Sequence, residues 1–334
     1  MTDWRQGFKG TDVNTESRVQ NRKPRLLKML VIVGLLLLCV IPLTVGLGVG
    51  LAKRHSHRST PETPHDSEAL GRPSLWAPQV GVSWQIVLSQ SVKVDAGSTM
   101  ITPNVDVYVL DLFDTKRETI DRLRRVGKNV VCYFSAGSWE DWREDASDYH
   151  TADLGNNLDG WAGERWVNVS AESVRSVMRN RIKLAAEKGC DGIDPDNVDG
   201  YENNNGLRLS SQDAVNFVKF LADEARKYNI ATGLKNAGYI IHKVLDSVHF
   251  SVNEQCVEFS ECKTFAPFIK AGKPVFHIEY PEGAPSVSSS ERTQICSATG
   301  AATGTDKFST VLKKMNLDGW VQYCTGQSVT TPTA

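Results

Sequence analysis

The chain has 334 residues, with 38 Lys and Arg against 39 Asp and Glu, which gives a formal net charge of −1. This balance hides an asymmetry. Residues 1–58 contain 10 basic and 3 acidic residues, which leaves 28 basic and 36 acidic residues, a net charge near −8, for the rest of the chain. So acidic a region disfavours a nucleic acid or another anionic surface as partner and suits a cationic substrate.

An uncharged apolar segment, residues 29–52, is long enough to cross a bilayer as one helix. Seven basic residues precede it and three follow it closely, so the positive-inside rule places residues 1–28 in the cytosol. A cleaved signal peptide fits less well, because its apolar core is usually about 7–15 residues long. We expect a cytosolic tail (1–28), a transmembrane signal anchor (29–52) and a single-pass type II protein of the plasma membrane. Its main domain then lies outside the cell, where the sequon at Asn168 predicts N-glycosylation.

Residues 53–79 are rich in Ser, Pro, His and charge and show no apolar periodicity, which predicts a stalk or linker. The remaining residues, 80–334, form one compositionally even block. That length is typical of a single barrel domain.

Short apolar runs alternate with helical segments over this block. The predicted strands are 82–88, 105–110, 129–134, 190–193, 230–234, 248–252, 274–278 and 318–322. The predicted helices are 116–126, 171–188, 211–228, 259–271 and 306–315, and Ser210 or Ser211 is the expected N-cap of the third. The alternation predicts an α/β fold, a (β/α)₈ TIM barrel. A doubly wound open sheet is the alternative, but no Gly-rich phosphate loop supports it.

One of the seven cysteines, Cys39, lies in the apolar segment, and the other six lie in the region expected outside the cytosol. An even number of cysteines in an oxidising compartment predicts disulfides. The expected pairs are Cys256 with Cys262 and Cys296 with Cys324. Cys132 and Cys190 lie on candidate neighbouring strands, and the sequence leaves open whether they pair or remain buried thiols.

An acidic run ends the fourth predicted strand. Asp194 and Asp196 are two residues apart, so in an extended chain their side chains fall on the same face. Two carboxylates on one face are costly to ionise together unless a cation, a metal or a sugar hydroxyl network lies between them. The alternative is a calcium-like or solvated acidic turn. We favour a catalytic carboxylate at the mouth of a barrel.

Polar residues also end the other predicted strands, and the active sites of barrels lie where the strands end. Acids, amides and aromatic residues without a His and Asp metal pattern indicate a sugar-binding cleft that needs no cofactor or metal. Trp84 either stacks on a sugar or packs in the core. The expected substrate-binding residues are Trp84, Asp111, Tyr133, Ser135, Asp194, Lys235, Asn236, Asn253, Glu279, Tyr280 and Gln322.

Glycoside hydrolysis generally needs two carboxyl groups that flank the scissile bond. Asp196 and Glu254 are the best pair, because they close the fourth and sixth predicted strands and can face each other across the barrel mouth. One attacks or activates water, and the other protonates the leaving oxygen, which requires a raised pKa. An ion pair with a loop cation is the alternative for Glu254, and Asp194 is the close competitor of Asp196.

The segment Asp191–Val198 resembles the DGxDxDxE signature of family 18 chitinases, but Val198 stands where that family has its catalytic Glu. A wider set of motifs resembles glycoside hydrolase family 114, the fungal and bacterial endo-α-1,4-polygalactosaminidases, over about residues 80–325. These motifs are Trp84-Gln85, Val109–Asp111, Val131–Gly137, Gly192–Asp199, Gly233–Asn236 and Asn253–Cys256.

This resemblance implies a barrel that cleaves internal α-1,4 bonds between galactosamine units with retention. It also implies that Asp196 is the nucleophile and Glu254 the acid/base. The anchored layout is similar to that of fungal members that act on galactosaminogalactan, a cell-wall and biofilm exopolysaccharide. Deacetylated galactosamine is cationic near neutral pH, which agrees in sign with the acidic domain.

Two alternatives stay open. A non-catalytic, cell-surface glycan-binding barrel has the same cleft without turnover. A metal-dependent polysaccharide deacetylase requires clustered His and Asp ligands, and the external histidines show no such spacing. We expect a monomer whose partners are a polysaccharide and, through the N-terminal helix, the membrane, with no nucleic acid.

Overall fold

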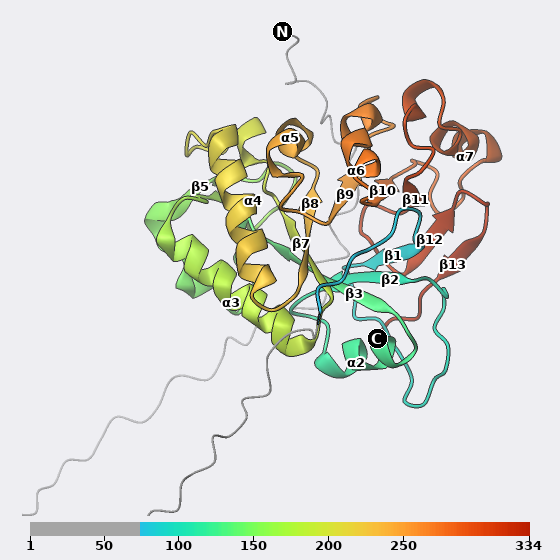
Figure 1. Cartoon of the computed structure of the whole chain (residues 1–334), viewed down its shortest axis with the longest axis horizontal. Helices are drawn as coiled ribbons and strands as arrows, with labels where there is room; N and C mark the ends of the chain where they lie inside the picture. The colour runs from blue at the N-terminus through green and yellow to red at the C-terminus, as the bar shows by residue number, and fades with distance from the viewer. Residues whose placement is uncertain (1–73) are drawn as a thin grey trace, which may run out of the picture. The chain divides into compact units, whose positions relative to one another are not determined.

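The computed structural model describes residues 74–334, which form an α/β unit built on a curled sheet (Figure 1). The predicted tail (1–28), the predicted membrane anchor (29–52) and most of the predicted stalk (53–79) lie outside the described residues. Within residues 74–334, no helix combines the length and the apolar character that a membrane span requires.

Ten strands form the main sheet, and the first eight in its order are parallel neighbours. In that order they are β1 (Trp84–Val87), β2 (Val107–Asp111), β3 (Asn129–Ser135), β7 (Gly192–Asp196), β8 (Ala231–Lys235), β9 (Phe250–Glu254), β10 (Val275–Glu279) and β11 (Ser309–Leu312). The last two strands, β12 (Trp320–Tyr323) and β13 (Ser328–Thr330), are antiparallel. The sheet curls far enough for the Leu88 N–H to bond the carbonyl of Leu317, 2.9 Å away, between β11 and β12.

Three predicted helices are confirmed with small shifts at their ends: α2 (Arg117–Arg125), α3 (Glu172–Lys188) and α4 (Ser211–Arg226). Ser210 caps α4 in a capping box with Asp213, as expected from its position before the apolar face. The predicted helix 259–271 is present only as η5 (Cys262–Phe265) and α6 (Ala266–Lys270). Figure 1 shows α3 and α4 side by side along the sheet. Further short helices that the sequence did not predict are α5 (Ile241–Val244), α7 (Ser289–Cys296), η1 (Ala146–Asp148), η2 (Thr151–Asp153), η3 (Gly200–Glu202), η4 (Gly238–Ile240) and η6 (Gly300–Ala302).

The predicted helix 306–315 is wrong, because this segment contains strand β11. Phe308, Val311, Leu312 and Met315 have helical spacing, which favoured the helix. In the structure the segment pairs with β10, and consecutive side chains point to opposite faces: Val311 joins the interior of the sheet and Leu312 packs outside it. The predicted strand 318–322 corresponds to β12, which is antiparallel and not part of the parallel series.

Two apolar layers line the two faces of the curled sheet. The inner layer contains Trp84, Val109, Val131, Phe250 and Ile278, one residue in every two along each strand. The intervening residues pack under the helices in the outer layer. Hence the position of a residue within its strand decides whether its side chain lies inside the curl.

A second, three-stranded antiparallel sheet follows β3 and was not predicted. It consists of β4 (Ser138–Glu140), β6 (Glu164–Val167) and β5 (Leu154–Asn157), in this order. Its strands are only three or four residues long. A strand of this length carries too little apolar alternation to be recognised from the sequence.

Three disulfides link the six cysteines of the described region, Cys132–Cys190, Cys256–Cys262 and Cys296–Cys324. The two expected pairs are confirmed, and the open question about Cys132 is resolved in favour of pairing. Cys132 lies on β3 and Cys190 directly precedes the adjacent β7, so this bond ties two strands of the sheet together.

The buried amine of Lys313 predicts a pH-dependent stability. Burial lowers the pKa of Lys313 to about 7, while its Nζ donates to Gln85 Oε1 (3.1 Å) and to the Asp318 carbonyl (2.6 Å). Between pH 7 and 10 the unfolded chain binds a proton that the folded protein lacks, so folding becomes more favourable as pH rises. We expect the free energy of unfolding of the wild type to rise by about 2 kcal/mol relative to that of Lys313→Met between pH 7 and 9, as measured by urea unfolding. A difference that does not change with pH would contradict this assignment.

Candidate active site

A buried ammonium group lies among three carboxylates at the carboxyl ends of β7, β8 and β9. Lys235 Nζ lies 3.7 Å from Asp194 Oδ2, 3.5 Å from Asp196 Oδ2 and 3.6 Å from Glu254 Oε2. The three strands are consecutive parallel neighbours, so their ends meet at one edge of the sheet. Each of these residues alternates with an outward-facing neighbour, which places all four side chains inside the curl.

Asp196 is held by donors from two directions. Its Oδ2 accepts a hydrogen bond from the Tyr133 hydroxyl (2.8 Å), and its Oδ1 accepts one from the Asn197 N–H (2.8 Å). Tyr133 comes from β3, the strand next to β7. The orientation of this carboxylate is therefore fixed on both oxygens.

Glu254 is held in a similar way by the flanking strands. Asn236 Nδ2 donates to Glu254 Oε2 (3.1 Å), and Asn236 Oδ1 accepts the Glu254 backbone N–H (2.9 Å). The Tyr280 hydroxyl, which follows β10, donates to Glu254 Oε1. Of the residues expected to bind substrate, the structure brings Tyr133, Lys235, Asn236 and Tyr280 to the two carboxylates, and each of the four contacts Asp196 or Glu254 directly.

Burial and the neighbouring lysine act in opposite directions on the pKa of Asp194. Burial raises the pKa of Asp194 to about 7, and Lys235 opposes this effect only in part. Burial works against the charge of Lys235, but Asp196, Glu254 and Asp194 together raise the pKa of this lysine above its ordinary value. Burial and the adjacent carboxylates also raise the pKa of the Tyr133 and Tyr280 hydroxyls, which remain proton donors. Asp194 therefore titrates near neutral pH beside a permanent cation.

Three other predicted site residues end strands but lie on the outer face of the sheet, since their neighbours Val252, Ile278 and Val321 point inward. They are Asn253, Glu279 and Gln322. The Gln322 Nε2 donates to Ser328 Oγ (2.9 Å) on β13. Glu279 Oε1 accepts the Val257 N–H (2.7 Å). The structure does not bring these three side chains to the carboxylate pair.

Trp84 lies in the core and not in a cleft. It is the first residue of β1, so it lies at the amino ends of the strands, away from the carboxylates, and it is 1% exposed. Its ring packs 5.0 Å from that of Phe276, and its Nε1 donates to the Ser309 carbonyl (2.7 Å). An inward-facing position at the start of a strand explains this burial.

Asp111 is engaged by an arginine that the sequence did not single out. Arg143 donates to both Asp111 oxygens (3.2 and 2.7 Å) and to Glu140 Oε2 (2.9 Å). Arg181 in turn donates to both oxygens of Asp145 (2.8 Å each). This buried network ties the segment after β3 to the ends of β2 and to α3. No local sequence pattern marks it, because its members come from separate segments.

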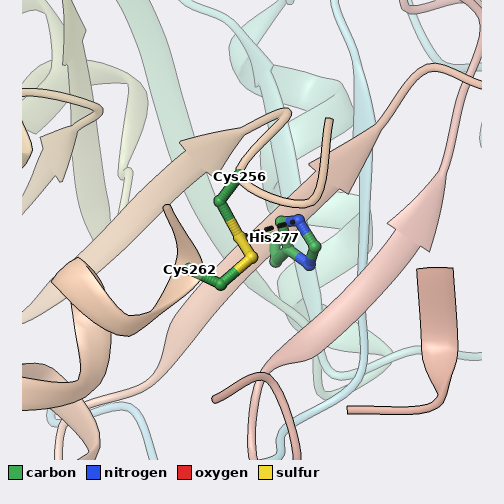
Figure 2. A group of neighbouring side chains, drawn as sticks. All are labelled: Cys256, Cys262 and His277. Carbon is green, nitrogen blue, oxygen red and sulfur yellow. Dashed lines mark hydrogen bonds between the residues drawn. A yellow bond between two sulfur atoms is a disulfide. The ribbon is translucent and has the colours of Figure 1, made fainter. Parts of the chain in front are cut away.

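Cys256, Cys262 and His277 form a compact group beside the segment that follows Glu254 (Figure 2). The His277 Nε2 lies 3.3 Å from Cys256 Sγ and 2.7 Å from Glu279 Oε1. The two sulfur atoms are bonded to each other, so neither is a free thiolate that could bind a metal. The group holds the segment after β9 against β10.

The comparisons with known proteins agree with this geometry. The family model for glycoside-hydrolase family GH114 matches residues 65–329. The crystal structure of Aspergillus fumigatus Ega3 in complex with galactosamine is 46% identical, covers 76% of this chain and 99% of its own, and has a TM-score of 0.69. The glycoside hydrolase domain of PelA from Pseudomonas aeruginosa is 13% identical over 70% of this chain and 95% of its own, with a TM-score of 0.52, and shows the fold alone. No curated protein matches the chain.

Replacement of Lys235 by an uncharged residue should strongly destabilise the protein, to an extent that depends on pH. Lys235→Met leaves three carboxylates without their counter-charge, which costs about 3–5 kcal/mol when a buried pair loses one partner. Asp194 has a raised pKa in the folded state, so its contribution to stability falls as pH rises, and the loss of Lys235 extends this fall above pH 7. Urea unfolding should therefore show a larger deficit at pH 8 than at pH 5. The exposed Lys219→Met on α4 is the control and should stay within about 0.5 kcal/mol of wild type.

Proposed function

The chain belongs to glycoside-hydrolase family GH114 and is a glycoside hydrolase, and we propose that it cleaves internal α-1,4 linkages of a deacetylated galactosamine polymer such as galactosaminogalactan. The observation that carries the proposal is that Asp196 and Glu254 lie on the two strands that flank the strand of Lys235, each within 3.6 Å of its ammonium group. Both carboxylates end parallel strands at the edge of the sheet where barrel enzymes have their active sites.

We assign Asp196 as the nucleophile and Glu254 as the acid/base of a retaining reaction. Asp196 Oδ2 and Glu254 Oε2 are at most about 7 Å apart, the sum of their 3.5 and 3.6 Å distances to Lys235 Nζ. Retaining pairs are about 5–5.5 Å apart and inverting pairs about 6.5–9.5 Å. This limit for the two oxygens that face Lys235 is compatible with the retaining separation.

A cationic sugar suits the acids around the pair. Burial and Asp196 raise the pKa of Asp199 to about 7, and burial raises the pKa of Glu202 and of Glu261, with Glu202 adding to the latter effect. The charged groups that act on these three acids are all acidic. A bound ammonium group supplies the missing positive charge. Ega3, the relative at 46% identity, was crystallised with galactosamine, which agrees with this substrate class.

Substitution of either carboxylate tests the function. Asp196→Asn and Glu254→Gln should each lower cleavage of the partly deacetylated polymer by at least about a thousandfold, because each removes a group that reacts with the substrate. Residues 74–334 are incubated with the polymer, and oligosaccharide products are measured by mass spectrometry. Glu187→Gln, an exposed acid on α3, is the control and should cleave like wild type.

The results also discriminate between the alternatives. Wild-type turnover in Asp196→Asn or Glu254→Gln would refute the assignment of the pair. Polymer binding without products from the wild type would indicate a glycan-binding barrel, and release of acetate a deacetylase. NMR of the first products reads the stereochemistry, with the α-anomer expected for retention.

We also propose that residues 29–52 anchor a monomeric catalytic domain on the outer side of the plasma membrane. The charge asymmetry around the segment and the three disulfides of the described domain support this topology. The full chain with an N-terminal tag should remain in the membrane pellet after carbonate extraction. External protease should remove the domain and spare the tag.

The sequon offers an independent readout of the same topology. Asn168→Gln should abolish a mobility shift caused by an N-glycosidase, because only a domain that enters the secretory route carries this glycan. Loss of the N-terminal tag from the mature protein would instead indicate a cleaved signal peptide.

A further inference from the structure

The residue after the proposed nucleophile has an unusual backbone conformation. Asn197 has φ of +60°, a left-handed conformation that asparagine tolerates better than most residues with a side chain. In this conformation its own N–H points back to Asp196 Oδ1, at 2.8 Å. The turn that ends β7 therefore supplies one of the donors that orient the carboxylate.

The Asn197 side chain links this turn to the small sheet. Its Nδ2 donates to Ser135 Oγ at the end of β3 (2.9 Å) and to Ser138 Oγ on β4 (3.3 Å). Ser138 Oγ donates in turn to Glu164 Oε2 on β6 (2.8 Å). Ser135, Ser138 and Glu164 are all buried. A chain of hydrogen bonds thus runs from the small sheet to the residue beside the nucleophile.

The backbone is clamped at the same place. The N–H groups of Ala136 and Gly137 both donate to the Asp196 carbonyl, at 2.9 and 3.0 Å. A Cβ atom on Gly137 would lie 1.7 Å from the Asn197 carbonyl oxygen, so only glycine permits this approach. The corner between β3 and β4 therefore packs closely against the backbone carbonyls of Asp196 and Asn197.

We propose that Asn197 is a positioning residue for the glycosidase reaction and that the sheet β4–β6–β5 acts through it as a brace for the Asp196 carboxylate. The inference rests on the proposed function insofar as the reaction uses Asp196. Neither Ser138 nor Glu164 contacts the two reacting carboxylates, so they act through Asn197. The brace fixes Oδ1 by the Asn197 N–H, while Oδ2 faces Tyr133 and Lys235. Such orientation matters because a misplacement of about 1 Å can cost about a hundredfold in rate.

The decisive variant is Asn197→Gly. Glycine keeps the left-handed backbone and the N–H, and removes only the amide link to Ser135 and Ser138. We expect kcat to fall by about tenfold or more with KM within about twofold, because binding contacts persist while the nucleophile is less well oriented. Asn229→Gly is the matched control: Asn229 has φ of +54° and lies just before β8, at the amino end of the strand whose carboxyl end carries Lys235. It should leave kcat unchanged.

A second variant and a structural measurement separate positioning from folding. Ser138→Ala breaks the link to Glu164 and should lower kcat in the same direction by a smaller factor. Crystal structures of wild type and Asn197→Gly should show the Asp196 carboxylate displaced or in two rotamers in the variant. The crystallographic comparison tests the role of Asn197 even if the wild type cleaves no galactosamine polymer. A lack of cleavage would refute the proposed function but not the proposed positioning of Asp196.

Three outcomes overturn the inference. One is an unchanged kcat in Asn197→Gly while Asp196→Asn is inactive. Another is a rise in KM at constant kcat, which would make Asn197 a substrate ligand. The third is an Asp196 carboxylate that keeps its wild-type position in the variant crystal.

Discussion

The arrangement of this site depends on one buried cation. Lys235 is 2% exposed, and its ammonium group lies within 3.7 Å of three carboxylates. A buried charge without a partner costs several kcal/mol, so neither the lysine nor the acids are tolerable at this position alone. The parallel order β7–β8–β9 satisfies the constraint, because it places the lysine on the strand between those that carry the acids. The cation thereby lowers the electrostatic cost of bringing the carboxyl groups of Asp196 and Glu254 close together.

Side chains alternate between the two faces of the sheet along each strand. This alternation determines which of the predicted residues lie in the site. The sequence identified the ends of seven of the eight parallel strands to within three residues, because apolar runs bounded by polar residues are a local signal. It did not assign each end residue to a face, since a shift of one position reverses the direction of the side chain. Glu254 and Tyr280 point inward, whereas Asn253 and Glu279 lie outside. Strand β11 was missed for a related reason: its apolar residues fit a helical period, and only pairing with β10 selects the extended form. Arg143 and Asn197 depend on contacts between distant segments, which no local pattern records.

Three aspartates of this region, Asp111, Asp194 and Asp196, have different surroundings and different roles. Asp111 is bound on both oxygens by Arg143 and fixes the segment after β3 to β2. Asp194 is buried beside Lys235 and has a pKa near 7, so its charge varies within the physiological range. Asp196 contacts a cation and two hydrogen-bond donors, and its side chain is 19% exposed. The surroundings, and not the carboxyl group, determine which acid supports the structure and which takes part in chemistry.

Different structural elements hold the two carboxylates of the proposed catalytic pair, Asp196 and Glu254. On the side of Asp196 the brace is the small sheet, which acts through Ser138 and Asn197. On the side of Glu254 the segment after β9 is fixed by the disulfide Cys256–Cys262 and by the Val257 N–H, which donates to Glu279. Lys235 contacts both carboxylates, but the hydrogen bonds from the neighbouring segments are also needed to fix the distance between the two side chains. That distance decides whether a water molecule fits between carboxylate and sugar, and therefore the stereochemistry of cleavage. The segments after β3 and β9 therefore help to set the separation of Asp196 and Glu254, on which the stereochemistry of the proposed reaction depends.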